Sequence, residues 1–426
     1  MKRSESNTAL RTFRLVCEPD QRPLVEELLR AEGFEFHCLD LHPSCRRLSV
    51  APFALGASLA AQFGLIYIQD QSSLLPPLAL CPQPGETVLD LCASPGSKAG
   101  LAAQLVGGDG LILANEPTAK RHQTLRRNME LLNLFQVCTS SANGQTLPAP
   151  AQLFDKVLLD VPCSGWGTVE KNPKVTRIWR EEKLGPLIGL QRQLLGRAAE
   201  LLAPGGRLVY STCTTNPREN EEQVAWAREN TALGCVRLFP AKGCRFEDTD
   251  QNLAPGSLLV DGPASGGQSF FLACLTKPGP KPTEPGVDLP TEPAPMDIQT
   301  VPSDPEPDWS RLPAGRLEQD RGRVFFRPDK ASQELGRTLA WKGLSLGKTA
   351  GGGLLPDAGL RLLLPDEPGK DGLQVEETSV LRSLLSGQSL TADSHSKRLG
   401  LYWRGLPLGW LTVKGRRALW SGRTMS

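Results

Sequence analysis

FDKVLLDVPCSG (Phe154–Gly165) and GGRLVYSTCTTNP (Gly205–Pro217) are two hydrophobic segments that each end at a cysteine. About one helix's worth of sequence lies between them, which is the pattern of two parallel strands joined by a crossover helix. In an open α/β sheet, ligands bind outside the carboxyl ends of the parallel strands. We therefore expect Asp160, Cys163 and Cys213 to meet in one cleft.

The surrounding sequence continues this alternation of strands and helices from Glu86 onward. The expected strands are TVLDLC, LILANE, VCTSSA, KVLLDVPC, RLVYSTCT and a last one in QSFFLACLTK. The expected helices lie at about Ser97–Val106, Arg121–Leu132, Leu187–Leu202 and Arg218–Glu229. This alternation predicts the α/β class, with a doubly wound, Rossmann-like core at residues 76–277.

Three other regions flank this core and differ from it in composition. Residues 1–75 predict a small α/β module, with a helix at about Pro23–Glu32 and short strands in EFHCLDLHP and RRLSVAP. Residues 278–308 contain ten prolines and an excess of acidic residues, which predicts an extended, semi-rigid linker. Residues 309–426 are rich in Gly, Leu and Arg in short, turn-punctuated segments, which predicts a β-rich domain.

The cysteine, histidine and hydrophobic content indicates a soluble protein. No run of eighteen apolar residues occurs, and MKRSESNTALRTF lacks the apolar segment of a signal peptide, so we expect a cytoplasmic location and no membrane partner. Eleven cysteines with no Cys-x-x-Cys spacing and four scattered histidines predict neither a disulfide framework nor a metal site. Most cysteines are expected to be small buried residues, among them Cys17, Cys81, Cys138 and Cys274. The oligomeric state stays open.

The net charge of +2 means that any contact with nucleic acid must come from local basic patches. One candidate group lies on an expected helix and could equally be a solvated face: Arg121, Arg126 and Arg127. A second group follows the first cysteine motif, next to the expected cleft, and is expected to contact phosphates: Lys171, Lys174, Arg177 and Arg180.

The segment after the first strand of the core has the features of a cofactor loop. TVLDLC runs into ASPGSK and a helix, which leaves free backbone N–H groups beside small residues. Glu116 follows the next strand, in position to bind ribose hydroxyls. The glycine patterns of dinucleotide and phosphate loops are absent, so S-adenosylmethionine, with a ribose and no phosphate, suits the loop better than NAD or ATP. An ordinary strand, Pro-Gly turn and helix would look the same.

The two cysteines are stronger evidence than either would be alone. An ordinary thiol is only a few per cent thiolate at neutral pH, so a nucleophilic cysteine needs a helix terminus or a positive neighbour. Lys98, at the same sheet edge, could supply that charge. One such cysteine would more often be a core residue, but Cys163 and Cys213 both lie at adjacent strand ends among turn-forming residues.

Four segments carry a resemblance to a known family. DVPCSGWGTVEKNP, YSTCTTNPRENE, VLDLCASPGSK and YIQDQSS are similar, in order and spacing, to motifs of the Nop/Sun family of RNA cytosine-5 methyltransferases. Within that family the chain most resembles the methyltransferases of bacterial small-subunit ribosomal RNA of the F type. The resemblance is strong from about Pro19 to Lys277, and GLPLGWLTVKG resembles the end of a PUA-like RNA-binding domain, here residues 309–426.

The resemblance implies S-adenosylmethionine as cofactor and RNA as substrate, most of all small-subunit (16S) ribosomal RNA. Transfer RNA is the alternative substrate, and a catalytically silent RNA-binding or ribosome-assembly factor is the alternative of another class. It implies that Cys213 adds to carbon 6 of the cytosine, that Cys163 assists release, and that Asp160 contacts the base near nitrogen 3 and sits against the cofactor. The implied cofactor residues are Cys92, Ala93, Ser94, Pro95, Gly96, Ser97, Lys98, Glu116, Asn143 and Asp160, with Lys98 also near the reacting groups.

Two positions depart from the family pattern. Asn143 stands where the family commonly has an acidic residue near the adenine, although an amide can still donate and accept hydrogen bonds. Val161 replaces the usual alanine of the Asp-Ala-Pro-Cys motif, a change expected to be neutral.

The end of the chain combines positive charge with aromatic residues. From His395 to Ser426 there are seven Lys or Arg residues and no Asp or Glu. The interleaved aromatic residues are Tyr402, Trp403, Trp410 and Trp420. They suit RNA binding by charge and stacking, or else they form the core of a small β domain.

Overall fold

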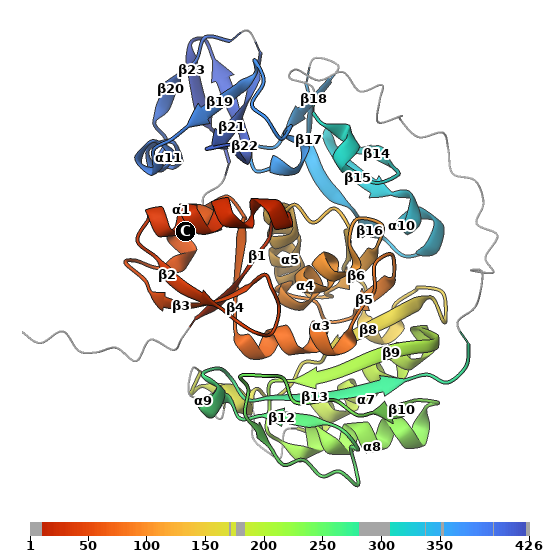
Figure 1. The fold of residues 1–426 in the computed structure, drawn as a ribbon. Coiled ribbons are helices and arrows are strands. Elements are labelled where there is room, and N and C mark those ends of the chain that lie inside the picture. The colour runs from red at the N-terminus through yellow and green to blue at the C-terminus, as the bar shows by residue number, and fades with distance from the viewer. Residues whose placement is uncertain are drawn as a thin grey trace, which may run out of the picture.

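The computed structural model describes residues 11–169, 172–175, 184–280, 307–336, 338–350, 353–394 and 396–422 (Figure 1). Three of the basic residues expected to contact phosphates, Lys171, Arg177 and Arg180, lie outside these residues, as do His395 and most of the expected linker. Within the described residues, no helix has both the length and the apolarity needed to cross a bilayer.

The N-terminal module is a four-stranded sheet in the order β2-β3-β1-β4 with one long helix packed on it. Its elements are β1 (Thr12–Leu15), α1 (Arg22–Ala31), β2 (Glu35–Cys38), β3 (Cys45–Val50), α2 (Leu59–Gln62) and β4 (Ile66–Gln69). The apolar face of α1 buries Val25, Leu28 and Leu29, because they recur at helical spacing. The helix and the two short strands predicted here are confirmed, whereas β1 was not foreseen.

The central sheet has the order β11-β12-β13-β9-β8-β5-β6-β7-β16. Its parallel strands are β5 (Thr87–Asp90), β6 (Leu111–Asn115), β7 (Val137–Ser140), β8 (Phe154–Asp160) and β9 (Leu202–Thr212). The antiparallel side contains β10 (Gly234–Val236), β11 (Phe246–Glu247), β12 (Leu258–Val260) and β13 (Phe270–Thr276). The predicted α/β class and Rossmann-like core are therefore confirmed.

Helices cover both faces of this sheet (Figure 1). Val88 packs with α3 (Leu75–Leu80), α4 (Ser97–Val106) and α5 (Ala119–Leu132) on one face. Its neighbour Leu89 packs with α7 (Gly185–Leu201) and α8 (Glu221–Asn230) on the other, because successive strand residues point to opposite faces. The long helices of the core match the predicted ones to within a few residues, and a short helix, α9 (Gly262–Ser265), precedes β13.

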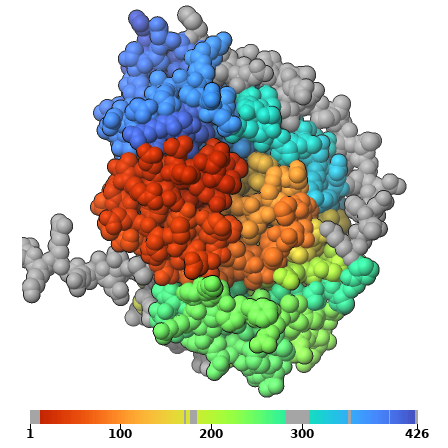
Figure 2. Space-filling model, in the orientation of Figure 1, coloured from red at the N-terminus to blue at the C-terminus, as the bar shows by residue number. Residues whose placement is uncertain are grey.

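The C-terminal part is β-rich, as predicted, and forms two sheets. The first contains β14 (Gly315–Asp320), β15 (Arg323–Pro328), β17 (Leu344–Ala350) and β18 (Gly353–Pro356), with α10 (Asp329–Glu334) after β15. The second contains β19 (Gly372–Val375), β20 (Ser389–Thr391), β21 (Arg398–Trp403), β22 (Leu406–Lys414) and β23 (Arg417–Trp420), with α11 (Thr378–Leu385) beside it. Figure 2 shows this part, in blue, seated on the N-terminal module, in red.

Burial decides between the two interpretations of the C-terminal aromatic residues. Tyr402, Trp403 and Trp410 are at most 1% exposed, and Trp420 is half-buried against Phe63 of the N-terminal module. These rings form the core and an internal contact, so stacking on RNA by the first three is excluded. The prediction of a buried cysteine is confirmed for Cys138 and Cys274, whereas Cys17 is only partly buried and Cys81 is exposed at the end of α3. The expectation that most cysteines are buried is wrong, because only three of the eleven are: Cys45, Cys138 and Cys274.

An edge strand from the C-terminal part completes the central sheet, which the sequence did not indicate. β16 (Trp341–Lys342) pairs antiparallel with β7, with Trp341 opposite Ser140. Arg361 adds a buried tie, because its guanidinium donates to the carbonyl oxygens of Val16 at 2.9 Å and Leu131 at 3.1 Å. Burial lowers the pKa of Arg361 to about 10. The C-terminal part is thus fastened to the other two regions by backbone and side-chain contacts.

Candidate active site

The two predicted cysteines meet at the carboxyl ends of β8 and β9. These strands are adjacent and parallel, with Asp160 in register with Ser211. The Sγ atoms of Cys163 and Cys213 are 3.1 Å apart. Asp160 lies beside them and accepts a hydrogen bond from the hydroxyl of Ser211 at 2.8 Å. The structure therefore brings together the three side chains that the sequence placed in one cleft.

The two thiols differ in acidity because one donates to the other. The hydrogen bond from Cys163 lowers the pKa of Cys213, and the positive charge of Lys98 lowers it further, against the effects of burial and of Asp160. The same hydrogen bond, together with burial, raises the pKa of Cys163 well above its ordinary value. Of the two thiols, Cys213 is therefore the one that ionises more readily.

Lys98 supplies the positive charge of the cleft. Its Nζ atom is 2.7 Å from Oδ2 of Asp160 and lies 5.1 Å from the centre of the Phe270 ring. Burial opposes the charged ammonium, but the carboxylate of Asp160 outweighs burial, and the pKa of Lys98 is raised. The ammonium therefore remains charged at neutral pH, beside both the carboxylate and the thiol pair.

The predicted cofactor loop, Cys92–Lys98, connects β5 to α4 and is held from two sides. Asn128 on α5 donates to the carbonyl oxygen of Pro95 at 2.7 Å, and Arg14 of the N-terminal module donates to that of Ser97 at 2.9 Å. Gly96 has φ +107°, and an added Cβ would lie 2.4 Å from the end of the Met129 side chain. The positive φ favours glycine at this position, whereas the flexible end of Met129 could move to relieve the close contact.

Glu116 lies at the end of β6, as predicted, and is 1% exposed. One carboxylate oxygen accepts from the backbone N–H of Thr118 at 2.9 Å, and the other is 3.2 Å from Arg121. Arg121 also donates to the carbonyl oxygen of Ser94 at 3.1 Å. Arg121, which was considered as a phosphate contact or a solvated residue, therefore orders the loop and Glu116.

Asn143 follows β7 but is exposed and occupied by its own turn. Its side-chain oxygen accepts a hydrogen bond from the backbone N–H of Gln145 at 3.1 Å, which caps the short turn Gly144–Thr146. Asn143 also lines a surface hollow together with Arg192 and Trp226. Its neighbour Ala142 is linked to β6 by a 3.0 Å bond from Asn115.

Asp90, at the end of β5, is a site residue that was not predicted. It is 1% exposed, and within the described residues neither carboxylate oxygen has a hydrogen-bond partner of ordinary geometry. Burial raises the pKa of Asp90 to about 7, while the charge of Lys98 partly opposes this and that of Asp160 adds to it. The available signal was an acidic residue inside an otherwise apolar strand, directly before the loop.

These residues fit S-adenosylmethionine, which carries an ammonium, a sulfonium and a ribose. A buried carboxylate without partners is costly, and a cation would relieve that cost. Asp90 offers such a carboxylate beside the loop, and Glu116 offers an acceptor for ribose hydroxyls at the neighbouring strand end. The carboxylates therefore lie at the strand ends where the cofactor's polar groups would need them.

Comparison with known proteins agrees with this geometry. Residues 77–275 match the family model described as 16S rRNA methyltransferase RsmB/F. The ribosomal RNA small subunit methyltransferase F of Salmonella heidelberg is 39% identical over 235 residues, which cover 54% of this chain and 49% of that protein. The protein of the same name from Salmonella agona is 39% identical over 227 residues. The chain thus spans about half the length of the curated relatives it matches.

Solved structures give the same result. The methyltransferase homolog protein from Pyrococcus horikoshii has a TM-score of 0.54 and 31% identity, over 63% of this chain and 86% of that chain. NSun6 from Pyrococcus horikoshii, solved with SFG, has a TM-score of 0.54 at 19% identity, over 63% of this chain and 90% of that chain, and so supports the fold. The resemblance found in the sequence motifs is confirmed, and the chain belongs to the RsmB/F methyltransferase family.

Proposed function

We propose that this protein transfers a methyl group from S-adenosylmethionine to carbon 5 of a cytosine in RNA, most of all small-subunit ribosomal RNA in the cytoplasm. The observation that carries the proposal is the thiol pair, with Sγ atoms 3.1 Å apart, next to the Lys98–Asp160 ion pair. Family membership and the names of the relatives point to ribosomal RNA among possible substrates.

Cys213 is the nucleophile of the proposed reaction. Carbon 5 of cytosine is a poor nucleophile, and addition of the Cys213 sulfur to carbon 6 makes carbon 5 enamine-like. The lowered pKa of Cys213 increases the fraction of reactive thiolate at neutral pH. When bound, S-adenosylmethionine supplies the electrophilic methyl group.

Asp160 and Lys98 orient and stabilise the base. Asp160 is fixed between Ser211 and Lys98 by contacts of 2.8 Å and 2.7 Å, so its carboxylate is held rigidly beside the thiols. From there it contacts the cytosine near nitrogen 3, and the ammonium of Lys98 beside it offsets the negative charge that develops on the ring as the sulfur adds to carbon 6. A paired base cannot enter such a cleft, so the target cytosine is unpaired or flipped out.

Cys163 assists product release. The proton on carbon 5 must leave and the bond between carbon 6 and sulfur must break, so that the double bond between carbons 5 and 6 forms again. Cys163 lies beside the sulfur of Cys213, which must leave carbon 6. In the free protein the pKa of Cys163 is raised, so its thiol is protonated. Once Cys213 is bonded to the base, its sulfur no longer carries the charge that keeps Cys163 protonated, so Cys163 releases its proton to water. The Cys163 thiolate then accepts the proton of carbon 5, the double bond between carbons 5 and 6 forms again, and Cys213 leaves as a thiolate.

The other contacts to the cofactor are inferred from the positions of residues at the ends of the parallel strands. The loop residues Cys92, Ala93, Ser94, Pro95, Gly96, Ser97 and Lys98 hold the methionine part, together with Asp90. Glu116 binds the ribose through its carboxylate, and Arg121 forms an ion pair with one oxygen of that carboxylate. Asn143 faces the adenine, which requires its side chain to leave the turn that it caps.

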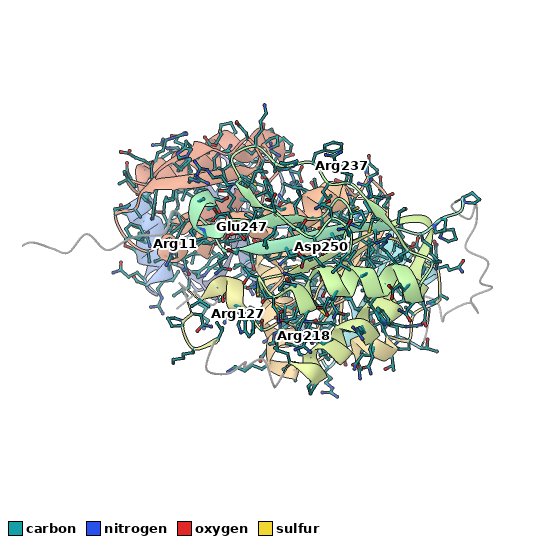
Figure 3. All side chains as sticks on the ribbon, turned by 90° about the horizontal axis from the view of Figure 1, so that it is seen from below. Arg11, Arg127, Arg218, Arg237, Glu247 and Asp250 are labelled. Carbon is teal, nitrogen blue, oxygen red and sulfur yellow. The ribbon has the colours of Figure 1, made fainter. Side chains whose placement is uncertain are left out.

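RNA contacts are proposed for charged surfaces and not for stacking. Residues 309–426 form the PUA-like RNA-binding domain of the proposal, and residues 1–75, 76–277 and 278–308 form the N-terminal module, the catalytic domain and the linker. Exposed basic residues of the second C-terminal sheet and its flanks include Lys397, Lys414, Arg416 and Arg417. In the catalytic domain, Lys174 is exposed after the first cysteine motif. Arg127 and Arg218, both labelled in Figure 3, are two further basic residues of this domain. Contacts of this kind make binding dependent on salt.

The test is methyl transfer from labelled S-adenosylmethionine to purified small ribosomal subunits, naked ribosomal RNA and bulk transfer RNA. Wild type should label ribosomal RNA, Cys213→Ala should label nothing, and Cys38→Ala, at an exposed cysteine of β2, should match wild type. Labelling confined to transfer RNA would contradict the substrate. An active Cys213→Ala variant would contradict the mechanism, and binding of RNA without any labelling would favour a silent assembly factor.

A further inference from the structure

The buried carboxylate of Glu219 lies beneath the loops that contain Cys163 and Cys213, and it has no role in the reaction described above. Glu219 ends the turn Pro217–Glu219 that follows the Cys213 motif, and its side chain is completely buried. Within the described residues, no lysine or arginine forms an ion pair with it. A buried carboxylate is costly unless hydrogen-bond donors replace water, so its surroundings must supply them.

Four neutral donors converge on Glu219. Oε2 accepts from the backbone N–H of Ser164 at 2.9 Å and from the side-chain amide of Gln191 at 3.0 Å. Oε1 accepts from the hydroxyl of Ser164 at 2.5 Å and from the side-chain amide of Asn216 at 3.3 Å. The backbone carbonyl of Glu219 accepts from the hydroxyl of Tyr210 at 2.7 Å, which fixes the residue to β9.

These donors belong to both cysteine loops. Ser164 directly follows Cys163, and Asn216 lies in the loop after Cys213. Gln191 also donates to the carbonyl oxygen of Pro162 at 2.9 Å, so the network holds the chain on both sides of Cys163. The hydroxyl groups of Ser164 and Thr214 are a further 2.8 Å apart and link the loops directly.

We propose that Glu219 is a positioning residue, which locks the two loops so that the thiol of Cys163 points at the sulfur of Cys213. Beyond the strand ends the two loops share one backbone hydrogen bond, from the N–H of Gly167 to the carbonyl oxygen of Cys213 at 3.0 Å. The carboxylate of Glu219 adds the side-chain anchor that both loops have in common, beside the sulfur atoms 3.1 Å apart. Since the hydrogen bond from Cys163 activates Cys213, loosening the anchor lowers the reactivity of the nucleophile. The inference deepens the proposed function and rests on it for the catalytic meaning of that reactivity.

The test measures Cys213 alone, without cofactor or RNA. The rate of alkylation by iodoacetamide is followed against pH, and the modified peptide is located by mass spectrometry. Glu219→Gln keeps the shape of the side chain. Its amide N–H group would face hydrogen-bond donors, where the carboxylate oxygen accepted hydrogen bonds from them. We expect alkylation of Cys213 near neutral pH to be about tenfold slower, with the profile displaced to higher pH, because one hydrogen bond to a charged acceptor is worth a factor of at least that order.

Two further variants separate positioning from folding. Asp155→Asn changes another buried carboxylate of the same domain, which accepts from the backbone N–H of Thr87 at 3.0 Å at the far end of β8. It should lower the melting temperature without moving the alkylation profile. Ser164→Ala removes one donor from the network and should displace the profile in the same direction as Glu219→Gln, by less.

The outcomes are distinct. A folded Glu219→Gln protein with the wild-type profile would overturn the proposal. If that variant does not fold, an unchanged profile in Ser164→Ala would overturn it equally. A wild-type protein that shows the activated profile but methylates no RNA would contradict the proposed function and leave the positioning role in place. In the transfer assay, Glu219→Gln should lower kcat and leave the affinity for S-adenosylmethionine unchanged.

Discussion

Asp90 should couple the binding of S-adenosylmethionine to the loss of a proton. Burial raises the pKa of Asp90 to about 7 in the protein without ligand, so its carboxyl is largely protonated in mild acid. A cation bound beside the carboxyl favours its ionised form, and the proton then leaves as the cofactor binds. The apparent affinity for the cofactor should therefore be greatest above pH 7 and fall as the pH falls through that value.

The magnitude follows from that pKa. At about pH 6 roughly nine in ten Asp90 side chains are protonated before binding, so binding should release about 0.9 proton per cofactor. Between about pH 7 and about pH 6 the affinity should fall about fivefold, because the ionised fraction of Asp90 falls from about one half to about one tenth. The α-amino group of the cofactor has an ordinary pKa near about 8, so it stays protonated at about pH 6 and takes up almost no proton.

The assay is calorimetric titration with S-adenosylmethionine at about pH 6 in two buffers of different ionisation enthalpy, whose difference in heat gives the number of protons released. Asp90→Asn should release none and should bind with nearly constant affinity across this range. Asp155→Asn should behave as wild type. The reasoning is refuted if wild type releases no proton, or if Asp90→Asn keeps the same dependence on pH.

Three other changes have definite expected outcomes. Cys163→Ala should accumulate a covalent protein–RNA adduct, seen as a slow band on a denaturing gel, and absence of the band in an otherwise folded variant counts against the role in release. Diamide, a two-electron oxidant, should convert Cys163 and Cys213 to a disulfide with loss of two hydrogens, because their sulfur atoms are 3.1 Å apart; reversible loss of transfer activity, absent in Cys163→Ala, is the readout. Arg361→Met should lower the free energy of unfolding in urea by about 3 kcal/mol, since it leaves buried carbonyl groups without a donor; an unchanged value would show that the tie is not needed.

The sequence predicted that Asp160, Cys163 and Cys213 meet in one cleft because two strong patterns coincide there. Hydrophobic strands that end at Cys163 and Cys213 must place both residues at one sheet edge, whatever the details of the loops. The buried carboxylate of Glu219 and its donors, which hold the two cysteine loops, come from separate segments of the chain. No spacing rule connects those segments, so the network becomes visible only in the folded chain.

Other features of the structure could not be predicted from sequence patterns. β16 has only two residues, too few to show any alternation, and it pairs with β7 from far along the chain. Trp403 and Trp410 lie in a segment that mixes aromatic and basic residues, a pattern that is typical of surfaces that stack on RNA. Only their burial shows that they belong to the core. Asp90 occurs in a strand that is otherwise apolar, so its missing partners could not be foreseen.

The central claim is that Cys213 forms a covalent bond with carbon 6 of the target cytosine. The most direct measurement uses RNA in which cytosine is replaced by 5-fluorocytosine, since fluorine at carbon 5 cannot leave as a proton and release must stall. After incubation with S-adenosylmethionine and digestion, mass spectrometry should find a methylated, fluorinated nucleotide on the peptide that contains Cys213. A nucleotide on the Cys163 peptide, or no adduct from a protein that methylates ordinary RNA, would contradict the account.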